Sequence, residues 1–449
     1  MNERATIFAP ATAAGRAGLA VLRISGPQSA RVLPALTRRA MPAPRLATRA
    51  TIHDPVTHEP IDDGLVLWFP GPRSFTGEDV AELHVHGSRA VIAALLEALG
   101  RMPGLRLAEP GEFARRAFEA GKLDLASIEG LADLVAAETR AQARQALRQL
   151  QGEFGRRAGA WRERIARALA HAEAEIDFPD EDLPGGLIGA LAPELTKLVD
   201  EIDATLADGG VGERLREGVQ VAIIGAPNAG KSTLLNLLAK REAAIVSPLP
   251  GTTRDIVEVA LDLGGFPAIV ADTAGLRALD AGADGHAAIE AEGMRRARRR
   301  AEDADLRIAM IDAAAPDTAA VAPLVQPGDL IVVNKIDLKP ALGGGIDDKT
   351  ISVSLTDGIG IDGLMAALVA RVEALCGAGA AAAPLITRTR HRAALIECRA
   401  ALSRAQSAEA AELIAEDLRL AARAIGRIAG RVDVEDVLDA IFREFCIGK

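Results

Sequence analysis

Apolar and polar positions alternate in short runs over the first 110 residues. Runs such as GLAVLRISG, DGLVLWF and VAELHVHG lie between Pro and Gly turns, with one helical stretch at about residues 89–99. A period of two between turns predicts strands. We therefore expect a small α+β domain in this part of the chain.

The apolar spacing becomes helical after residue 110. One apolar stripe predicts a long amphipathic helix or a helical hairpin with the stripe in its core. Its members are Leu147, Leu150, Phe154, Trp161, Ile165, Leu169 and Ile176. A further helix is expected at about residues 193–207. Helical spacing returns after the linker-like sequence CGAGAAAAP.

Strands and helices alternate between these helical regions, from Val219 to about Leu375. The runs VQVAIIG, FPAIVAD, LRIAMID and DLIVVNK are typical of parallel strands covered on both faces. We expect a multidomain α+β and α/β protein in which an α/β domain is inserted into a discontinuous helical domain. The expected domains are residues 1–118 (N-terminal), 119–215 and 377–449 (helical), and 216–376 (inserted).

Composition narrows the class of protein. The 449 residues include 52 Lys and Arg against 62 Asp and Glu, so attraction to phosphate backbones is not the dominant surface property. The three cysteines form no CxxC pair, which fits a reducing compartment. No apolar run approaches the roughly 20 residues of a membrane span, and no secretory signal is apparent. We expect a cytoplasmic protein that does not bind membranes.

The sequence GAPNAGKS, at residues 225–232, follows a predicted strand and precedes a predicted helix. It matches the P-loop pattern, in which backbone N–H groups surround phosphates. Lys231 is expected to reach the β- and γ-phosphate oxygens, and Ser232 to bind Mg²⁺.

The sequence NKID, at residues 334–337, predicts that the nucleotide is GTP. A carboxylate at Asp337 accepts hydrogen bonds from N1–H and the 2-amino group of guanine, and adenine has no matching donors. A later loop, VSLTDGIG, stands where such proteins usually carry Ser-Ala-Lys. Here the residues are Ser354, Leu355 and Thr356.

Two segments between these motifs are typical of nucleotide-sensing switches. GTTRD offers Thr253 as a second Mg²⁺ ligand, and DTAG offers Asp272 as a carboxylate behind the ion. Leu276 follows DTAG where Ras-like enzymes have a glutamine, and an alkyl chain cannot orient water. Help in hydrolysis must therefore come from other residues.

Two kinds of residue are candidates for assisting hydrolysis, and the sequence allows two interpretations of each. Asn228 either holds a monovalent cation beside the phosphates or stiffens the loop through a side-chain hydrogen bond. Glu290 or Glu292 either positions the attacking water or lies on a solvated helix face.

Three other features also have two readings. The run MRRARRR is either an RNA-binding face or a solvated or interdomain helix face. His84 and His86 are either half of a metal site or structural. In the tail, CIGK, Cys446 is either chemically active or a small buried hydrophobe, and Gly448 permits a tight turn with positive φ.

These motifs together resemble the family of tRNA-modification GTPases called MnmE or TrmE. The resemblance covers nearly the whole chain and rests on LRISG, FTGEDVAELHVHG, PGEFARRAFEAGKLDL, GAPNAGKSTLLN, PGTTRD, DTAGLR, NKID and CIGK. It implies an N-terminal domain similar to folate-binding modules that dimerises, a helical domain and an inserted Ras-like G domain.

The resemblance also implies the activity and the partners. With an FAD- and NADH-using partner, MnmG, such a homodimer forms a heterotetramer or larger complex. It adds an aminomethyl or carboxymethylaminomethyl group at C5 of the wobble uridine of certain tRNAs. A tetrahydrofolate derivative, 5-formyl or 5,10-methylene, supplies the carbon. GTP hydrolysis depends on K⁺ and on dimerisation of G domains.

Site residues follow from the resemblance position by position. Glu290, Asn228 and Cys446 are the expected catalytic residues. Ser232 and Thr253 are the expected Mg²⁺ ligands, and the K⁺ ligands are Asn228, Ser247, Leu249 and Thr252. The folate contacts are Arg23, Glu82, Lys122 and Lys449. The expected GTP contacts are Asn228, Ala229, Gly230, Lys231, Ser232, Thr233, Ser247, Pro248, Leu249, Pro250, Gly251, Thr252, Thr253, Asp272, Thr273, Ala274, Gly275, Asn334, Lys335, Asp337 and Ser354.

A second hypothesis belongs to another class of protein. The generic G-domain motifs and MRRARRR also fit a GTP-switched assembly factor, such as one acting in ribosome maturation, with no part in modification chemistry. The modification state of wobble uridines in cells lacking the protein separates the two.

Overall fold

The computed structural model describes residues 5–177, 187–241, 258–272, 298–319, 321–338, 350–377, 384–430 and 448. The chain forms two compact units. The first combines Met1–Ala132, Gln149–Pro179 and Ala411–Lys449, and the second combines Asp133–Arg148 and Asp180–Ala410. Among the described residues, no helix has the length and apolar character needed to cross a bilayer.

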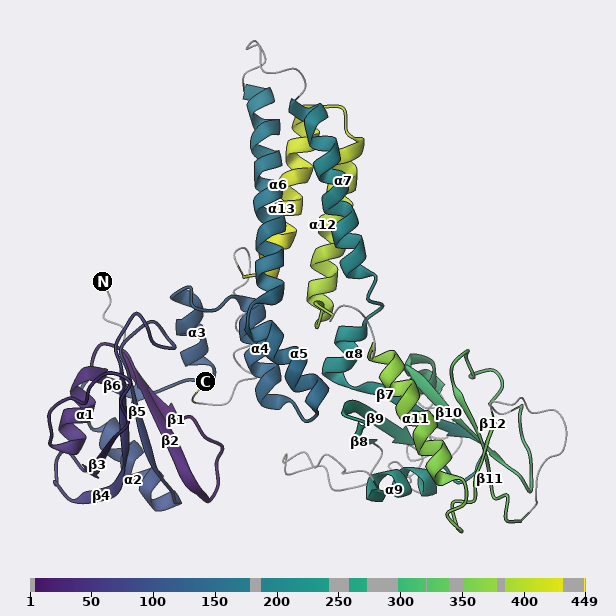
Figure 1. The fold of residues 1–449 in the computed structure, drawn as a ribbon, viewed down its shortest axis with the longest axis horizontal. Helices are drawn as coiled ribbons and strands as arrows, with labels where there is room; N and C mark the ends of the chain where they lie inside the picture. The colour runs from purple at the N-terminus through teal and green to yellow at the C-terminus, as the bar shows by residue number, and fades with distance from the viewer. Residues whose placement is uncertain are drawn as a thin grey trace, which may run out of the picture. The chain divides into compact units, whose positions relative to one another are not determined.

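A six-stranded sheet opens the first unit (Figure 1). Its spatial order is β3 (Thr48–His53), β4 (Pro60–Phe69), β5 (Val80–Gly87), β2 (Ala17–Ser25), β1 (Thr6–Pro10) and β6 (Leu105–Leu107). Helices α1 (Ser29–Thr37) and α2 (Arg89–Gly100) pack on one face, against Leu22, Ile24 and Leu83. Because side chains alternate along strands, Arg23 and Glu82 lie on the opposite face.

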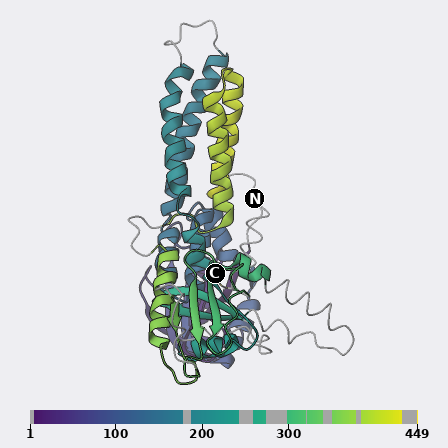
Figure 2. The ribbon, with the colours of Figure 1, turned by 90° about the vertical axis from the view of Figure 1, so that its right-hand side faces the viewer.

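Helices complete the first unit. They are α3 (Glu112–Glu119), α4 (Leu125–Ala136), α6 (Glu153–Asp177) and α13 (Ala411–Ile428). Helices α6 and α13 run side by side in both ribbon views (Figures 1 and 2). Trp161 on α6 is buried, which confirms its predicted place in a helical core.

The prediction of one apolar stripe from Leu147 to Ile176 was wrong at its start. Helix α5 (Arg140–Leu150) ends before Gly152, whose φ of 76° breaks the helix, and α6 begins at Glu153. Leu147 is 44% exposed and therefore not part of the core.

The second unit contains another six-stranded sheet, in the order β12 (Thr350–Ser352), β11 (Leu330–Asn334), β10 (Leu306–Asp312), β7 (Val219–Gly225), β9 (Phe266–Asp272) and β8 (Glu258–Leu263). All pairs are parallel except β8 with β9. Helices α9 (Lys231–Arg241) and α11 (Ile361–Leu375) pack against one face, and Ala301 and Val321 against the other. The predicted parallel sheet covered on both faces is confirmed, and β8 and β12 are additions to it.

Two long helices of the second unit, α7 (Leu187–Leu206) and α12 (Thr389–Ser407), also pack side by side. The short helix α8 (Val211–Glu217) leads into β7. Helical sequence therefore precedes and follows the α/β domain, which confirms the predicted fold class. Within the second expected helical range, 377–449, residues 378–383, 431–447 and 449 lie outside the described residues.

Candidate functional sites

The P-loop joins β7 to α9, and its backbone fits tightly against neighbouring strands. Gly225 has a φ of 155°, and a Cβ there would lie 2.5 Å from the Met310 carbonyl oxygen of β10. Gly230 has a φ of 102°, and a Cβ there would lie 2.4 Å from Asn334 Nδ2. The glycines of the motif are therefore required by the close approach of other groups as well as by the turn.

Two polar side chains of the P-loop region have defined partners. The buried Lys231 Nζ donates to the carbonyl oxygens of Gly225 and Ala226, at 3.0 and 2.8 Å. Ser232 Oγ donates to Asp272 Oδ2 at the end of β9. A serine hydroxyl beside a carboxylate is an oxygen donor set that fits Mg²⁺.

Asn334 connects the P-loop to the loop after β12. Its Nδ2 donates to the Ala229 carbonyl oxygen at 2.9 Å, and its Oδ1 accepts from the Leu355 N–H at 3.2 Å. Ser354 beside it is fully buried, and its Oγ accepts from the Asp357 N–H. The chain thus brings Asn334 and Ser354, two of the expected GTP contacts, together beside the P-loop, while Asp337 is exposed nearby on the chain.

Lys335 adopts a φ of 65° and pairs with Asp312 at the end of β10, at 2.6 Å. Burial would raise the pKa of Asp312, but the hydrogen bonds from Lys335 and from the Ala314 N–H keep it below its usual value. This ion pair was not predicted from the sequence, because it joins two strands that are adjacent only in the fold.

Asn228 is exposed and has a φ of 65°. Its side chain makes no hydrogen bond within the described part of the chain, so the loop-stiffening alternative finds no partner there. Other predicted residues lie outside the described ranges. These are Ser247, Pro248, Leu249, Pro250, Gly251, Thr252, Thr253, Thr273, Ala274, Gly275, Glu290, Glu292, Cys446 and Lys449.

A second candidate site surrounds Arg23 on the open face of the N-terminal sheet. Arg23 on β2 lies opposite Glu82 on β5, and its Nε donates to Glu82 Oε1 at 3.0 Å. The guanidinium carbon lies 5.2 Å from the ring centroid of Phe75 and 5.9 Å from that of Phe113. These contacts hold the arginine in place, while its two terminal nitrogens have no partner among the described residues.

Lys122 and Gly448 come close to the same site within the first unit. A Cβ on Gly77, two residues from Phe75, would lie 3.5 Å from Lys122 Cε. Gly448 has a φ of 109°, which confirms the prediction of a positive value, and its backbone abuts the Pro10 carbonyl. Pro10 ends β1 directly beside Ala9, the register partner of Arg23. Three of the predicted folate contacts, Arg23, Glu82 and Lys122, and the described tail residue Gly448 thus lie in the same part of the first unit.

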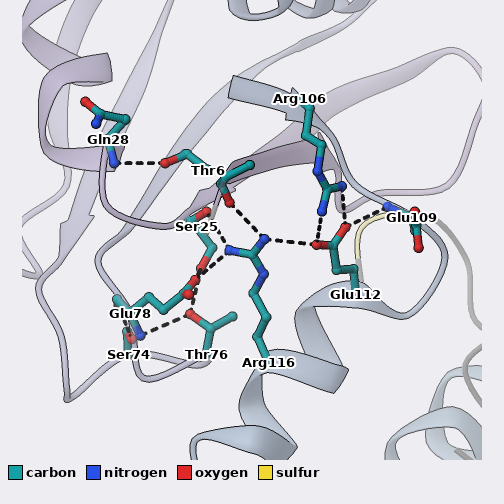
Figure 3. Close-up of polar contacts among 11 residues, drawn as sticks. Thr6, Ser25, Gln28, Ser74, Thr76, Glu78, Arg106, Glu109, Glu112 and Arg116 are labelled. Atoms are coloured by element: carbon teal, nitrogen blue, oxygen red, sulfur yellow. Dashed lines mark hydrogen bonds and ion pairs between the residues drawn. The ribbon is translucent and has the colours of Figure 1, made fainter. Parts of the chain in front are cut away.

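A buried ion-pair network ties α3 to the sheet beside this site (Figure 3). Arg116 is 5% exposed and donates to Glu78 and Glu112, at 2.9 Å each, and to the Ala5 carbonyl oxygen. Burial would raise the pKa of Glu112, but hydrogen bonds from Arg106, Glu109 and Arg116 keep it below its usual value. This network was not predicted from the sequence, although the motif PGEFARRAFEAGKLDL contains two of its members, Glu112 and Arg116.

The two histidines of HVHG each face a carboxylate. His84 Nε2 lies 3.3 Å from Glu82 Oε2, and His86 Nδ1 lies 2.8 Å from Asp62 Oδ1. No cluster of three or more metal-ligating side chains occurs among the described residues. The two His–carboxylate pairs favour the structural interpretation of HVHG.

The described arginines of MRRARRR are paired within the molecule. Arg298 and Arg299 face Glu302 and Asp303 one helical turn away, and Arg300 pairs with Glu258 on β8. The solvated-face reading therefore fits Arg298 and Arg299 better than direct contact with RNA.

Comparisons with known proteins agree with this architecture. A model described as the MnmE helical domain matches residues 125–446, and one described as the GTP-binding protein TrmE N-terminus matches residues 6–122. A tRNA modification GTPase MnmE from Parvibaculum lavamentivorans is 58% identical over 99% of this chain and all of its own. One from Rhodospirillum rubrum is 55% identical over 99% of both chains.

A human relative is also similar along nearly its whole length. It is named 5-taurinomethyluridine-[tRNA] synthase subunit GTPB3, mitochondrial, and is 47% identical over 99% of this chain and 93% of its own.

The inserted α/β domain with its P-loop and NKID segment defines a G-domain GTPase of the P-loop class. The matches over both the N-terminal and the helical regions then identify the particular family. The chain belongs to the MnmE family of tRNA modification GTPases.

Proposed function

We propose that this chain hydrolyses GTP to control the addition of an aminomethyl or carboxymethylaminomethyl group at C5 of the wobble uridine in certain tRNAs. The observation that supports this best is that one chain of this family combines a P-loop between β7 and α9 with a fixed arginine, Arg23, on the N-terminal sheet, where Gly448 packs against β1. The name of the human relative, a taurinomethyluridine synthase subunit, supports uridine modification as the task.

At the nucleotide site, Lys231 would bind the β- and γ-phosphates, Ser232 and Thr253 would hold Mg²⁺, and Asp337 would recognise guanine. Mg²⁺ neutralises the charge that develops on the phosphates. Asn334 supports this arrangement, because it joins the P-loop to the Ser354 loop. The remaining switch residues, from Ser247 to Thr253 and from Asp272 to Gly275, would complete the contacts.

Ras-like enzymes have a water-orienting glutamine at the position of Leu276. Two kinds of group would take over its role in this chain. Asn228, with Ser247, Leu249 and Thr252, would hold K⁺ beside the phosphates, and Glu290 or Glu292 would position water. Face-to-face dimerisation of two G domains would complete this site. The exposed side chain of Asn228 supports its part, since it has no competing partner among the described residues.

At the N-terminal site, a tetrahydrofolate derivative would bind Arg23, Glu82, Lys122 and Lys449, and Cys446 would act nearby. The terminal nitrogens of Arg23 suit a carboxylate, and Glu82 suits a ring N–H group. The working assembly would be a homodimer with the FAD- and NADH-using partner MnmG, in the cytoplasm.

Two experiments test the proposal. Mass spectrometry of wobble uridines from cells lacking the protein should show unmodified C5, whereas unchanged nucleosides would favour the assembly-factor hypothesis. GTPase rates should be higher in K⁺ than in Na⁺. Equal rates would contradict the cation role of Asn228 and would leave the proposed modification activity standing.

A further inference from the structure

Helix α5 carries three arginines on one face. Arg140, Arg144 and Arg148 are all exposed and lie one turn apart, about 6 Å from one to the next along the axis. No Asp or Glu occurs between residues 139 and 152, although the whole chain has a net charge of −10. These three residues, which we call the α5 arginine row, form a local basic strip on an acidic protein.

The opposite face of α5 is held firmly by the second unit. Gln142 Nε2 and Gln145 Nε2 donate to the carbonyl oxygens of Arg216 and Gly212 on α8, at 3.0 and 3.1 Å. The Ala141 N–H donates to the Gly265 carbonyl oxygen in the β8–β9 turn, at 3.2 Å. The helix cannot turn about its axis without breaking these bonds, so the arginine row faces solvent in a fixed orientation.

The arginine row differs from the other basic run in having no internal partners. Arg298 and Arg299 each face a carboxylate on their own helix. Arg140, Arg144 and Arg148 make no hydrogen bond or ion pair with any other described residue. Their positive charge is therefore available to an external anion.

Three guanidinium groups in a row suit a ligand with repeated phosphates, since each guanidinium can bind a phosphate through two parallel hydrogen bonds. Helix α5 has no aromatic side chain on which a base could stack. We propose that the α5 arginine row binds the phosphate backbone of the tRNA substrate. This inference rests on tRNA being the substrate and goes beyond the chemistry proposed above.

The test measures tRNA binding by the full-length chain as a function of salt. Replacing all three residues (Arg140→Gln, Arg144→Gln and Arg148→Gln) should weaken binding of a tRNA transcript by about tenfold or more. It should also reduce the slope of log affinity against log salt by about 1 for each lost phosphate contact. The Arg298→Gln, Arg299→Gln variant is the control, because it removes exposed arginines that already have partners. GTPase activity should be unchanged in both variants, which reports correct folding.

Several outcomes would overturn the proposal. These are unchanged affinity and slope in the triple variant, an equal loss in the control, or no salt-dependent tRNA binding by the wild-type chain. Unchanged tRNA binding with lost assembly with a protein partner would assign the row to an acidic protein surface instead. If the triple variant binds tRNA more weakly but cells lacking the protein have unchanged wobble uridines, this inference stands and the proposed modification is rejected.

Discussion

The groups of the nucleotide site and those of the Arg23 site are held in place in different ways. At the nucleotide site, the P-loop groups belong to one continuous stretch, residues 225–232, and close packing of glycines against β10 and Asn334 fixes its shape. At the Arg23 site, the groups come from β2, β5, the loop before β5 and α3, with Gly448 close by. A local motif defines the first, whereas tertiary structure defines the second.

This difference predicts which substitutions unfold the molecule and which only stop chemistry. The Arg23 site depends on α3, and α3 is fixed by the buried Arg116. Loss of the Arg116 side chain should therefore lower the stability of the N-terminal part of the chain, whereas loss of a P-loop side chain should lower the rate of GTP hydrolysis.

The largest expected effect is that of Arg116→Met on stability. It leaves Glu78 without its buried cation, and breaking such a pair costs roughly 3 to 5 kcal/mol. The N-terminal sheet holds Trp68 on β4, so its unfolding in urea can be followed by fluorescence in a Trp161→Phe background.

The matched control is Arg106→Met. Arg106 also pairs with Glu112 but is 45% exposed, so its loss should cost about 1 kcal/mol or less. Equal losses in the two variants would mean that burial of Arg116 contributes nothing, and the proposed difference between the sites would fail. GTPase activity should survive both changes at temperatures where the chain is folded.

The next effect is that of Lys231→Ala on hydrolysis. Removing a positioned charge from the phosphates should lower kcat by about 100-fold or more, with little change in the unfolding of the N-terminal sheet.

Arg23→Ala should have the opposite functional effect: GTP turnover should stay normal, whereas wobble-uridine modification should be impaired. Steady-state phosphate release and nucleoside mass spectrometry measure the two. A large fall in GTP turnover in Arg23→Ala would show that the sites are not separable.

The same difference explains how much the sequence could predict. The strand, loop and helix around residues 225–232 are contiguous, so spacing alone predicted the P-loop and the sheet that holds it. Phe113 and Arg116 stand in a motif that the sequence displays, yet their contacts with Arg23 and Glu78 depend on how α3 packs. Such contacts carry no periodic signal.

Two errors have specific physical causes. Periodicity extended the apolar stripe to Leu147 because it cannot register the helix break at Gly152. Strand β8 was missed although Val259, Leu261 and Leu263 alternate before a Gly-Gly turn, which is a hairpin signal. The exact domain bounds and the ligand roles of the site residues stay predictions.

A smaller effect is expected from Gly448→Ala in the tail. A Cβ there would lie 1.9 Å from the Pro10 carbonyl oxygen, and a positive φ is unfavourable for alanine. We expect a cost of roughly 1 to 3 kcal/mol for docking the tail on β1, with reduced modification and normal GTP turnover. Gly15→Ala is the control, because Gly15 also has a positive φ but a Cβ there would meet nothing within 4 Å. Normal modification in Gly448→Ala would separate the tail from the Arg23 site.

The smallest expected effect concerns the cysteines and would locate reactive sulfur in the tail rather than in the second unit. Burial raises the pKa of the Cys376 thiol to about 11 and that of the Cys398 thiol to about 12. Because the thiolate is the nucleophile, both should resist iodoacetamide at about pH 8, where an ordinary cysteine is partly ionised. Raising the pH to about 9 should still leave them almost fully protonated. Peptide mass spectrometry of the native protein should then find label on Cys446 alone, as expected if the tail carries the reactive thiol. Labelling of Cys376 or Cys398 at the rate of a free peptide would place accessible thiols in the second unit and remove this distinction between the second unit and the tail.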